Sequence, residues 1–219
     1  MNRPANIPRG WYSRGYLPHF DGGEIPQAIT FRLTDSFPRE RLEAWYEELA
    51  HLPEKEATLE RRKRIEVYLD KGFGQCWLRE PRIANLVQTA LLYFDGDRYH
   101  LHAWVFMPNH VHALLTPCAS WGLSEILHSW KSYTTHQANR LLARQGKFWQ
   151  EESFDRYIRD EQHFAAAVEY IEANPVKAGL CARSEEWQFG SATRRKAGET
   201  PALPGIGETP MLPDRKIYA

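Results

Sequence analysis

The histidines of the segment His110-Val111-His112 are the residues best suited to binding a metal ion. They follow Met107-Pro108-Asn109, and apolar runs on both sides of this break indicate two β-strands joined by a tight turn. Because side chains alternate along a strand, His110 and His112 share one face of it. Two imidazoles leave a divalent site incomplete, so a third ligand must come from another part of the chain.

A second pair with the same spacing, His100 and His102, lies on the preceding predicted strand. The neighbours on its strand face are Trp104 and Phe106, whose bulky apolar side chains are typical of packing. The pair after the turn begins a strand beside a loop, where binding residues commonly lie. We therefore favour the pair after the turn as ligands and keep the first pair as the alternative.

Tyr170 and Asn174 are polar residues that a predicted helix at residues 161–173 places one turn apart at its end. The apolar residues of this helix repeat at four and three positions and predict a buried stripe: Phe164, Val168 and Ile171. Because Pro175 disfavours the helical conformation of the residue before it, we expect the helix to end at Asn174. The amide oxygen of Asn174 is a hard ligand that suits Mg²⁺ or Mn²⁺, so it is the candidate third ligand.

The composition describes a globular chain without an overall attraction to nucleic acid. Lys plus Arg and Asp plus Glu each number 28, so the formal net charge is zero and any DNA-binding surface must be local. The cysteines, Cys76, Cys118 and Cys181, are isolated in sequence, which favours reduced thiols over disulfides or a zinc site. No apolar stretch has the length of a membrane span, and we expect a cytoplasmic protein.

Periodicity and turn residues predict an α+β domain at residues 28–190, between an extended arm at 1–27 and a Pro- and Gly-rich flexible tail at 191–219. The expected strands lie at residues 28–33, 98–106, 110–116 and 154–158. The expected helices lie at residues 38–49, 54–69, 81–94, 122–143 and 161–173. The run Arg61-Arg62-Lys63-Arg64 lies among glutamates, which favours an ion-paired helix face over a phosphate-binding patch.

The motifs together resemble a known family. Residues 108–112 resemble the His-hydrophobic-His motif of the HUH single-strand nucleases, and residues 154–160 followed by 169–180 resemble their single-tyrosine transposase branch. The whole pattern, over about residues 16–187, is most similar to the REP-associated tyrosine transposases. This resemblance implies a ferredoxin-like four-stranded antiparallel sheet with helices on one side. The helices predicted within residues 38–94 exceed the minimal family core and are an extra helical insertion.

The resemblance also implies a reaction. Tyr170 would be the nucleophile that attacks a DNA phosphate, releases a 3′-hydroxyl and forms a 5′-phosphotyrosine. His110, His112 and Asn174 would hold the divalent metal, Mg²⁺ or Mn²⁺. The substrate would be single-stranded DNA that carries a hairpin, or palindrome, and the protein is expected to be a monomer. The sequence indicates no dedicated general base.

Basic and aromatic residues are candidates for contact with that DNA, because single-strand grooves combine cations with stacking platforms. The candidates are Arg9, Arg14, Tyr16, Lys131, Arg140 and Arg144. An ordinary surface helix, and an arm whose aromatic residues pack on the core, explain the same residues. Two other functions remain as alternatives: a DNA-hairpin-binding protein with little or no catalysis, and a metallohydrolase whose nucleophile is water.

Overall fold

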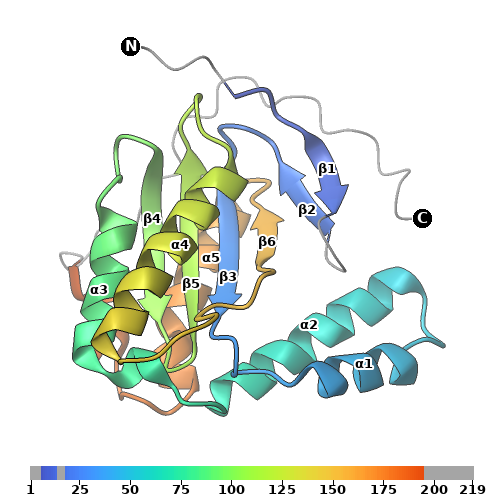
Figure 1. The fold of residues 1–219 in the computed structure, drawn as a ribbon. Coiled ribbons are helices and arrows are strands. Elements are labelled where there is room, and N and C mark those ends of the chain that lie inside the picture. The colour runs from blue at the N-terminus through green and yellow to red at the C-terminus, as the bar shows by residue number, and fades with distance from the viewer. Residues whose placement is uncertain (1–5, 14–17, 195–219) are drawn as a thin grey trace.

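The central element of the computed structural model, which describes residues 6–13 and 18–194, is a four-stranded antiparallel sheet with the order β4-β5-β3-β6 (Figure 1). Its strands are β3 (Gln27–Arg32), β4 (Tyr99–Phe106), β5 (His110–Pro117) and β6 (Phe154–Tyr157). All three neighbouring pairs are antiparallel. The order is that of the ferredoxin-like fold, and the predicted fold class is confirmed.

Helices cover both faces of this sheet. On one face, Phe31, Val111 and Ala113 pack against α3 (Pro81–Leu92) and α4 (Leu123–Leu141). On the opposite face, Val105 and Leu114 pack against α5 (Glu161–Lys177), which lies behind the sheet in Figure 1.

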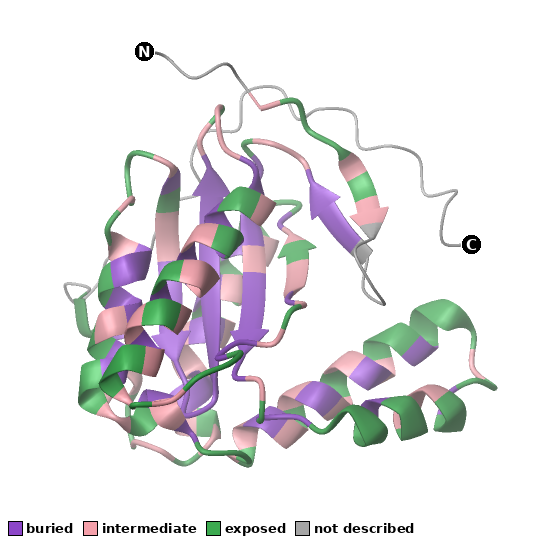
Figure 2. Ribbon diagram, viewed as in Figure 1, coloured by how far each residue is buried: buried purple, intermediate pink, exposed green. Residues whose placement is uncertain are grey.

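The expectation that all helices lie on one side is therefore wrong. Both faces of the central strands are apolar, and all eight residues of β5 are buried (Figure 2). A single helical layer would have left one of these faces in water.

The helix α5 begins where it was predicted to begin, at Glu161, but it ends later than predicted. Asp160 caps its first turn by accepting a hydrogen bond from the backbone N–H of His163 (2.7 Å). The predicted end at Asn174 is wrong, because the helix continues through Pro175 to Lys177. Pro175 has no N–H to donate, but the backbone N–H of Ala178 donates to the carbonyl oxygen of Asn174 (2.9 Å) and extends the helix beyond the proline.

The insertion between β3 and α3 is a pair of helices, α1 (Arg39–Glu48) and α2 (Glu54–Asp70), which we call the inserted hairpin. It extends sideways from the sheet in Figure 1, and the outer surfaces of both helices are exposed in Figure 2. A small apolar cluster holds the pair together: Phe37, Leu42, Ile65 and Leu69. The predicted ion-paired face is confirmed, since Arg61 pairs with Glu54 and Arg64 with Glu48 and Glu60.

The base of the inserted hairpin is fixed to the chain that leads into it. The backbone N–H of Gln75 donates to the Asp35 carboxylate (2.8 Å). Gly74 has a positive φ of 90°, and a Cβ at this position would lie 2.8 Å from the carbonyl oxygen of Asp35. Only glycine fits this close approach without strain. The end of α2 therefore has a defined place relative to the sheet.

The described part of the N-terminal segment is extended, as predicted, but it is also packed. The strands β1 (Gly10–Ser13) and β2 (Pro18–Asp21) form a two-stranded antiparallel sheet. Phe20 is buried against the ring of Tyr157, and its backbone N–H donates to Asp155 (3.0 Å). This favours the packing interpretation of the aromatic residues here.

Three parts of the chain complete the description. Short 3-10 helices lie at Trp77–Arg79, Ser184–Glu186 and Ser191–Arg194. Arg14, Tyr16 and the predicted tail from residue 195 onward lie outside the described residues. Among the helices that are described, none combines the length and apolar character needed to cross a membrane.

Candidate active site

The imidazoles of His110 and His112 converge on one point at the face of the sheet that α5 covers. Both histidines lie on β5, at 1% and 3% exposure, while Val111 between them packs in the core of the other face. Their Nε2 atoms are 3.0 Å apart and their rings are nearly perpendicular. The structure therefore brings this predicted pair together as a two-nitrogen site.

The opposite nitrogen of each ring is held by a neighbour. The side-chain amide of Asn109 donates to the carbonyl oxygen of Phe73 (2.9 Å), so its Oδ1 accepts from Nδ1–H of His110 (2.7 Å). Nδ1 of His112 is hydrogen-bonded to the hydroxyl of Thr30 (2.8 Å). These bonds orient both rings and leave Nε2 of His110 with a lone pair, as metal-binding histidines require.

Burial keeps both imidazoles neutral. Loss of hydration lowers the pKa of His110 well below its ordinary value, with a smaller effect from the neighbouring His112. Burial likewise lowers the pKa of His112 to about 3, assisted by the charges of Arg62 and Lys177. At neutral pH both rings are uncharged, so their lone pairs can bind a cation.

This arrangement fits a divalent ion. Two nitrogen ligands about 2.1 Å from an octahedral ion, at right angles to each other, lie about 3 Å apart, which matches the separation of the two Nε2 atoms. Without an ion, one Nε2–H donates to the other nitrogen over the same distance. In the described part of the chain, no three His, Cys, Asp or Glu side chains are already arranged to hold an ion. The pair therefore needs a further oxygen ligand.

Tyr170 reaches this site from α5, and Asn174 lies one turn further along that helix. The ring of Tyr170 packs edge-on against the ring of His112, with the two centroids 5.6 Å apart. Asn174 is buried at 2% exposure, and its side-chain NH₂ donates to the carbonyl oxygen of Tyr170 (2.7 Å). The amide oxygen of Asn174 is the side-chain atom left to bind a cation. The predicted tyrosine thus lies beside the histidines, with Asn174 one turn further along the same helix.

The sequence analysis missed two carboxylates of α2 that belong to this site. Glu66 lies near Tyr170 and its negative charge raises the pKa of the phenol, and Glu66 is paired with Arg62 (3.1 Å). One turn later, Oδ1 of Asp70 lies 4.0 Å from Nε2 of His110. The spacing of Arg62, Glu66 and Asp70 places them on one helix face, and this was the available signal.

These carboxylates change the acidity of the groups around them. Burial raises the pKa of Tyr170 well above its ordinary value, and the negative charges of Glu66 and Asp70 raise it further, while Arg62 opposes them. Burial, with the charge of Glu66, raises the pKa of Asp70 to about 6. The ammonium of Lys177 lies 4.7 Å from the centre of the Tyr170 ring. At neutral pH the phenol of Tyr170 is therefore protonated.

The alternative pair does not form a comparable site. A register shift in β4 between Leu101 and Ala103 interrupts the strand at His102. The ring of His102 packs edge-on against Phe164, and its Nε2 is hydrogen-bonded to Thr116 (2.8 Å). His100 is exposed. This supports the packing interpretation of the pair.

The candidate DNA contacts have different surroundings. The ammonium of Lys131 donates to the carbonyl oxygens of Gln150 (3.1 Å) and Glu151 (3.0 Å), so it holds a loop in place. Arg144 donates to the carbonyl oxygen of Lys147 (2.9 Å). Arg9 and Arg140 are exposed.

Comparisons with known proteins show which proteins this chain resembles. Residues 80–174 match the family model described as "Transposase IS200 like". A REP-associated tyrosine transposase of Escherichia coli (strain K12) is 28% identical over 112 residues, which cover 50% of this chain and 65% of that relative. A solved structure of a REP-associated tyrosine transposase bound to a REP hairpin superposes with a TM-score of 0.52 at 20% identity. That match covers 84% of this chain and 82% of the other.

The matched segment contains most of the site. Residues 80–174 include β5 with both histidines and α5 as far as Asn174. The inserted hairpin, with Glu66 and Asp70, lies outside residues 80–174.

Proposed function

Since the similarity of this chain to the REP-associated tyrosine transposases is confirmed, we propose that it cleaves and rejoins single-stranded DNA at hairpin sequences. The observation that carries the proposal is the convergence of two neutral, oriented imidazoles beside a partly buried tyrosine that a separate helix supplies. The relative of known structure was solved with a REP hairpin, so a hairpin of this kind is the natural substrate to propose.

In the proposed reaction, Tyr170 is the nucleophile. Its phenolic oxygen attacks the scissile phosphorus, the bond from phosphorus to the 3′-oxygen breaks, and a 3′-hydroxyl is released. The 5′ end of the downstream strand is then joined to the tyrosine. Because the phosphodiester is exchanged and not hydrolysed, a 3′-hydroxyl can attack the phosphotyrosine and rejoin the strand without a nucleotide cofactor.

Glu66 is the group placed to receive the proton of Tyr170. The phenol is protonated at neutral pH and lies close enough to this carboxylate for the charge of Glu66 to raise its pKa. As the oxygen attacks, its proton passes to Glu66, and the departing 3′-oxygen takes a proton from solvent. In the reverse direction Glu66 returns its proton to the phenol. Arg62, paired with Glu66 (3.1 Å), holds the carboxylate in position.

A divalent ion, Mg²⁺ or Mn²⁺, would be held by His110, His112 and Asn174, and it would supply polarisation of the scissile phosphate. The protein keeps the two imidazoles neutral and oriented for this purpose through Asn109 and Thr30. An aqueous phenol is a poor nucleophile at neutral pH, and burial makes Tyr170 still less acidic, so positioning must supply part of the rate.

DNA contact is proposed for the basic residues that the fold leaves accessible. A groove of about 960 Å³ lies between β1–β2, α1 and α4, and basic side chains line it beside glutamates. The exposed basic residues of the groove are Arg39 and Lys147, next to the partly buried Lys131 and the buried Arg32. Because the net charge of the chain is zero, binding should depend on such local clusters and weaken steeply with salt. We propose a monomer as the active species, which light scattering tests directly.

The test uses an internally labelled, hairpin-bearing single strand from palindromes near the gene, incubated with Mn²⁺ or Mg²⁺. A covalent protein–DNA adduct that both EDTA and Tyr170→Phe abolish would support the proposal. Hairpin binding without cleavage under any metal would replace it with the DNA-hairpin-binding alternative. Cleavage that survives Tyr170→Phe would mean that water is the nucleophile.

A further inference from the structure

The carboxylate of Asp70 lies on the side of His110 where a metal ion would bind. Its Oδ1 is 4.0 Å from Nε2 of His110, which is the same nitrogen that faces His112. The other ring nitrogen, Nδ1, is already held by Asn109. A carboxylate that only oriented the ring would lie at Nδ1, so the position of Asp70 is that of a ligand and not of an orienting group.

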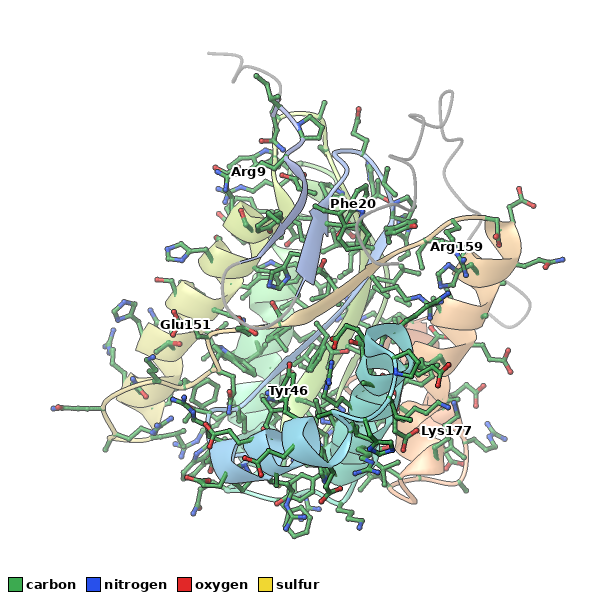
Figure 3. The ribbon with its side chains drawn as sticks, turned by 90° about the vertical axis from the view of Figure 1, so that its right-hand side faces the viewer. Arg9, Phe20, Tyr46, Glu151, Arg159 and Lys177 are labelled. Atoms are coloured by element: carbon green, nitrogen blue, oxygen red, sulfur yellow. The ribbon has the colours of Figure 1, made fainter. Side chains whose placement is uncertain are left out.

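The end of α2 is held near the histidines. Glu66, one turn before Asp70, lies near Tyr170 of α5 and raises its pKa. Phe73, just beyond the helix, accepts through its carbonyl oxygen the hydrogen bond from Asn109 (2.9 Å) in the turn before His110. Figure 3 shows α5 running from near the labelled Arg159 to the labelled Lys177. The hydrogen bond between Phe73 and Asn109 limits how far the end of α2 can move from the histidines.

The carboxylate of Asp70 has no close salt-bridge partner. Within the described ranges it forms no ion pair with a lysine or arginine, although its side chain is only 34% exposed, and Lys177 acts on it from a longer distance. The nearby Glu66, which is paired with Arg62, adds a second carboxylate. A bound cation would stabilise a carboxylate that is held beside a buried site without a close partner.

We propose that Asp70 is a further ligand of the divalent ion, so that the inserted hairpin completes the metal centre. This rests on the proposed function of the His110 and His112 pair. Carboxylate oxygen is the ligand that Mg²⁺ and Mn²⁺ prefer. Ligands of an octahedral ion lie about 3 Å apart when adjacent and about 4.2 Å apart when opposite, so the 4.0 Å separation from His110 leaves Asp70 within reach of an ion bound to that nitrogen.

The test measures Mn²⁺ binding to the purified full-length protein, without DNA, from the electron paramagnetic resonance signal of free Mn²⁺. We expect Asp70→Asn to weaken Mn²⁺ affinity by about tenfold or more. Glu56→Gln is the matched control, because Glu56 is an exposed acidic residue on the same helix. This variant should bind Mn²⁺ with the affinity of the wild-type protein. The Mn²⁺ affinity of His112→Ala shows separately whether the imidazole pair binds the ion.

The outcomes separate this inference from the proposed function. Unchanged affinity in Asp70→Asn, with binding lost in His112→Ala, would overturn the role of Asp70 and leave the proposed function standing. Wild-type protein that binds no Mn²⁺ would overturn both.

A second variant guards against misfolding. Asp70→Cys should raise the ratio of Cd²⁺ to Mn²⁺ affinity above that of wild type, because thiolate is a softer ligand than carboxylate. A folded Asp70→Cys protein with an unchanged ratio would contradict ligation by this position.

Discussion

Replacing Asp70 with asparagine should stabilise the metal-free protein at neutral pH. In the folded state the pKa of this carboxyl rises from 3.8 to about 6, because burial and the nearby charge of Glu66 disfavour its ionised form. At 1.36 kcal/mol per pKa unit, this shift sets an upper limit of about 3 kcal/mol on the cost of ionising Asp70 in the fold. Since 34% of the side chain is exposed and screened by water, we expect about 1 kcal/mol.

The pH dependence gives the sign of the effect. An acid whose pKa is higher in the folded state binds its proton more tightly there, so protonation stabilises the fold. This contribution is fully present below the unfolded-state pKa of about 3.8 and is lost as the pH rises through about 6. The advantage of Asp70→Asn over wild type should therefore be largest at pH 8 and shrink towards pH 4.

The assay is urea unfolding in EDTA at several pH values between 4 and 8, with Glu56→Gln as the control that should follow wild type. Adding Mn²⁺ should reverse the order at pH 8, because the ion stabilises the protein that binds it more tightly. An Asp70→Asn protein less stable than wild type in EDTA at pH 8 would refute the reasoning, as would an advantage independent of pH.

Three further substitutions test neighbouring parts of the account. Glu66→Gln should form the covalent adduct about a hundredfold more slowly than wild type at pH 7, and the difference should be smaller at high pH, where the phenol ionises without help. Equal rates of the variant and wild type at all pH values would exclude Glu66 as the proton acceptor. Thr30→Val removes the hydroxyl that is hydrogen-bonded to His112 and should weaken Mn²⁺ binding about tenfold, which calorimetry with the metal alone would detect. Ile171→Ala should lower the free energy of unfolding by about 3 kcal/mol, because this side chain is buried between α5 and the sheet; a loss under 1 kcal/mol in urea unfolding would contradict that packing.

Local sequence signals predicted the elements of the fold well. The expected strand at residues 28–33 is β3 at Gln27–Arg32, and the expected helix at 54–69 is α2 at Glu54–Asp70. Periodicity and proline or glycine boundaries are local properties, so they act before tertiary contacts form. The turn at Pro108 that places both histidines at the start of a strand was predicted for the same reason.

Features that depend on tertiary packing were not predicted. The central strands are apolar on both faces, so their sequence alone did not assign α5 to the face opposite α3 and α4. The end of α5 at Lys177 depends on hydrogen bonds that form around Pro175 and override its usual effect.

The carboxylates of α2 show the same limit in the site itself. Glu66 lies in a segment rich in charged residues, and its pairing with Arg62 is the pattern of a solvated helix. Tyr170, which lies near Glu66 in the structure, is more than a hundred residues away in sequence. The spacing of Arg62, Glu66 and Asp70 groups them on one helix face, but it does not say that this face meets the site.

The most direct test of the central claim is to locate the covalent bond. Wild-type protein would be incubated with the hairpin-bearing strand and Mn²⁺, digested with nuclease and trypsin, and analysed by mass spectrometry. The account predicts a nucleotide joined through its 5′-phosphate to the peptide that contains Tyr170, and no such peptide when EDTA is present. Cleaved DNA with an unmodified Tyr170 peptide, or a nucleotide on another residue, would contradict it.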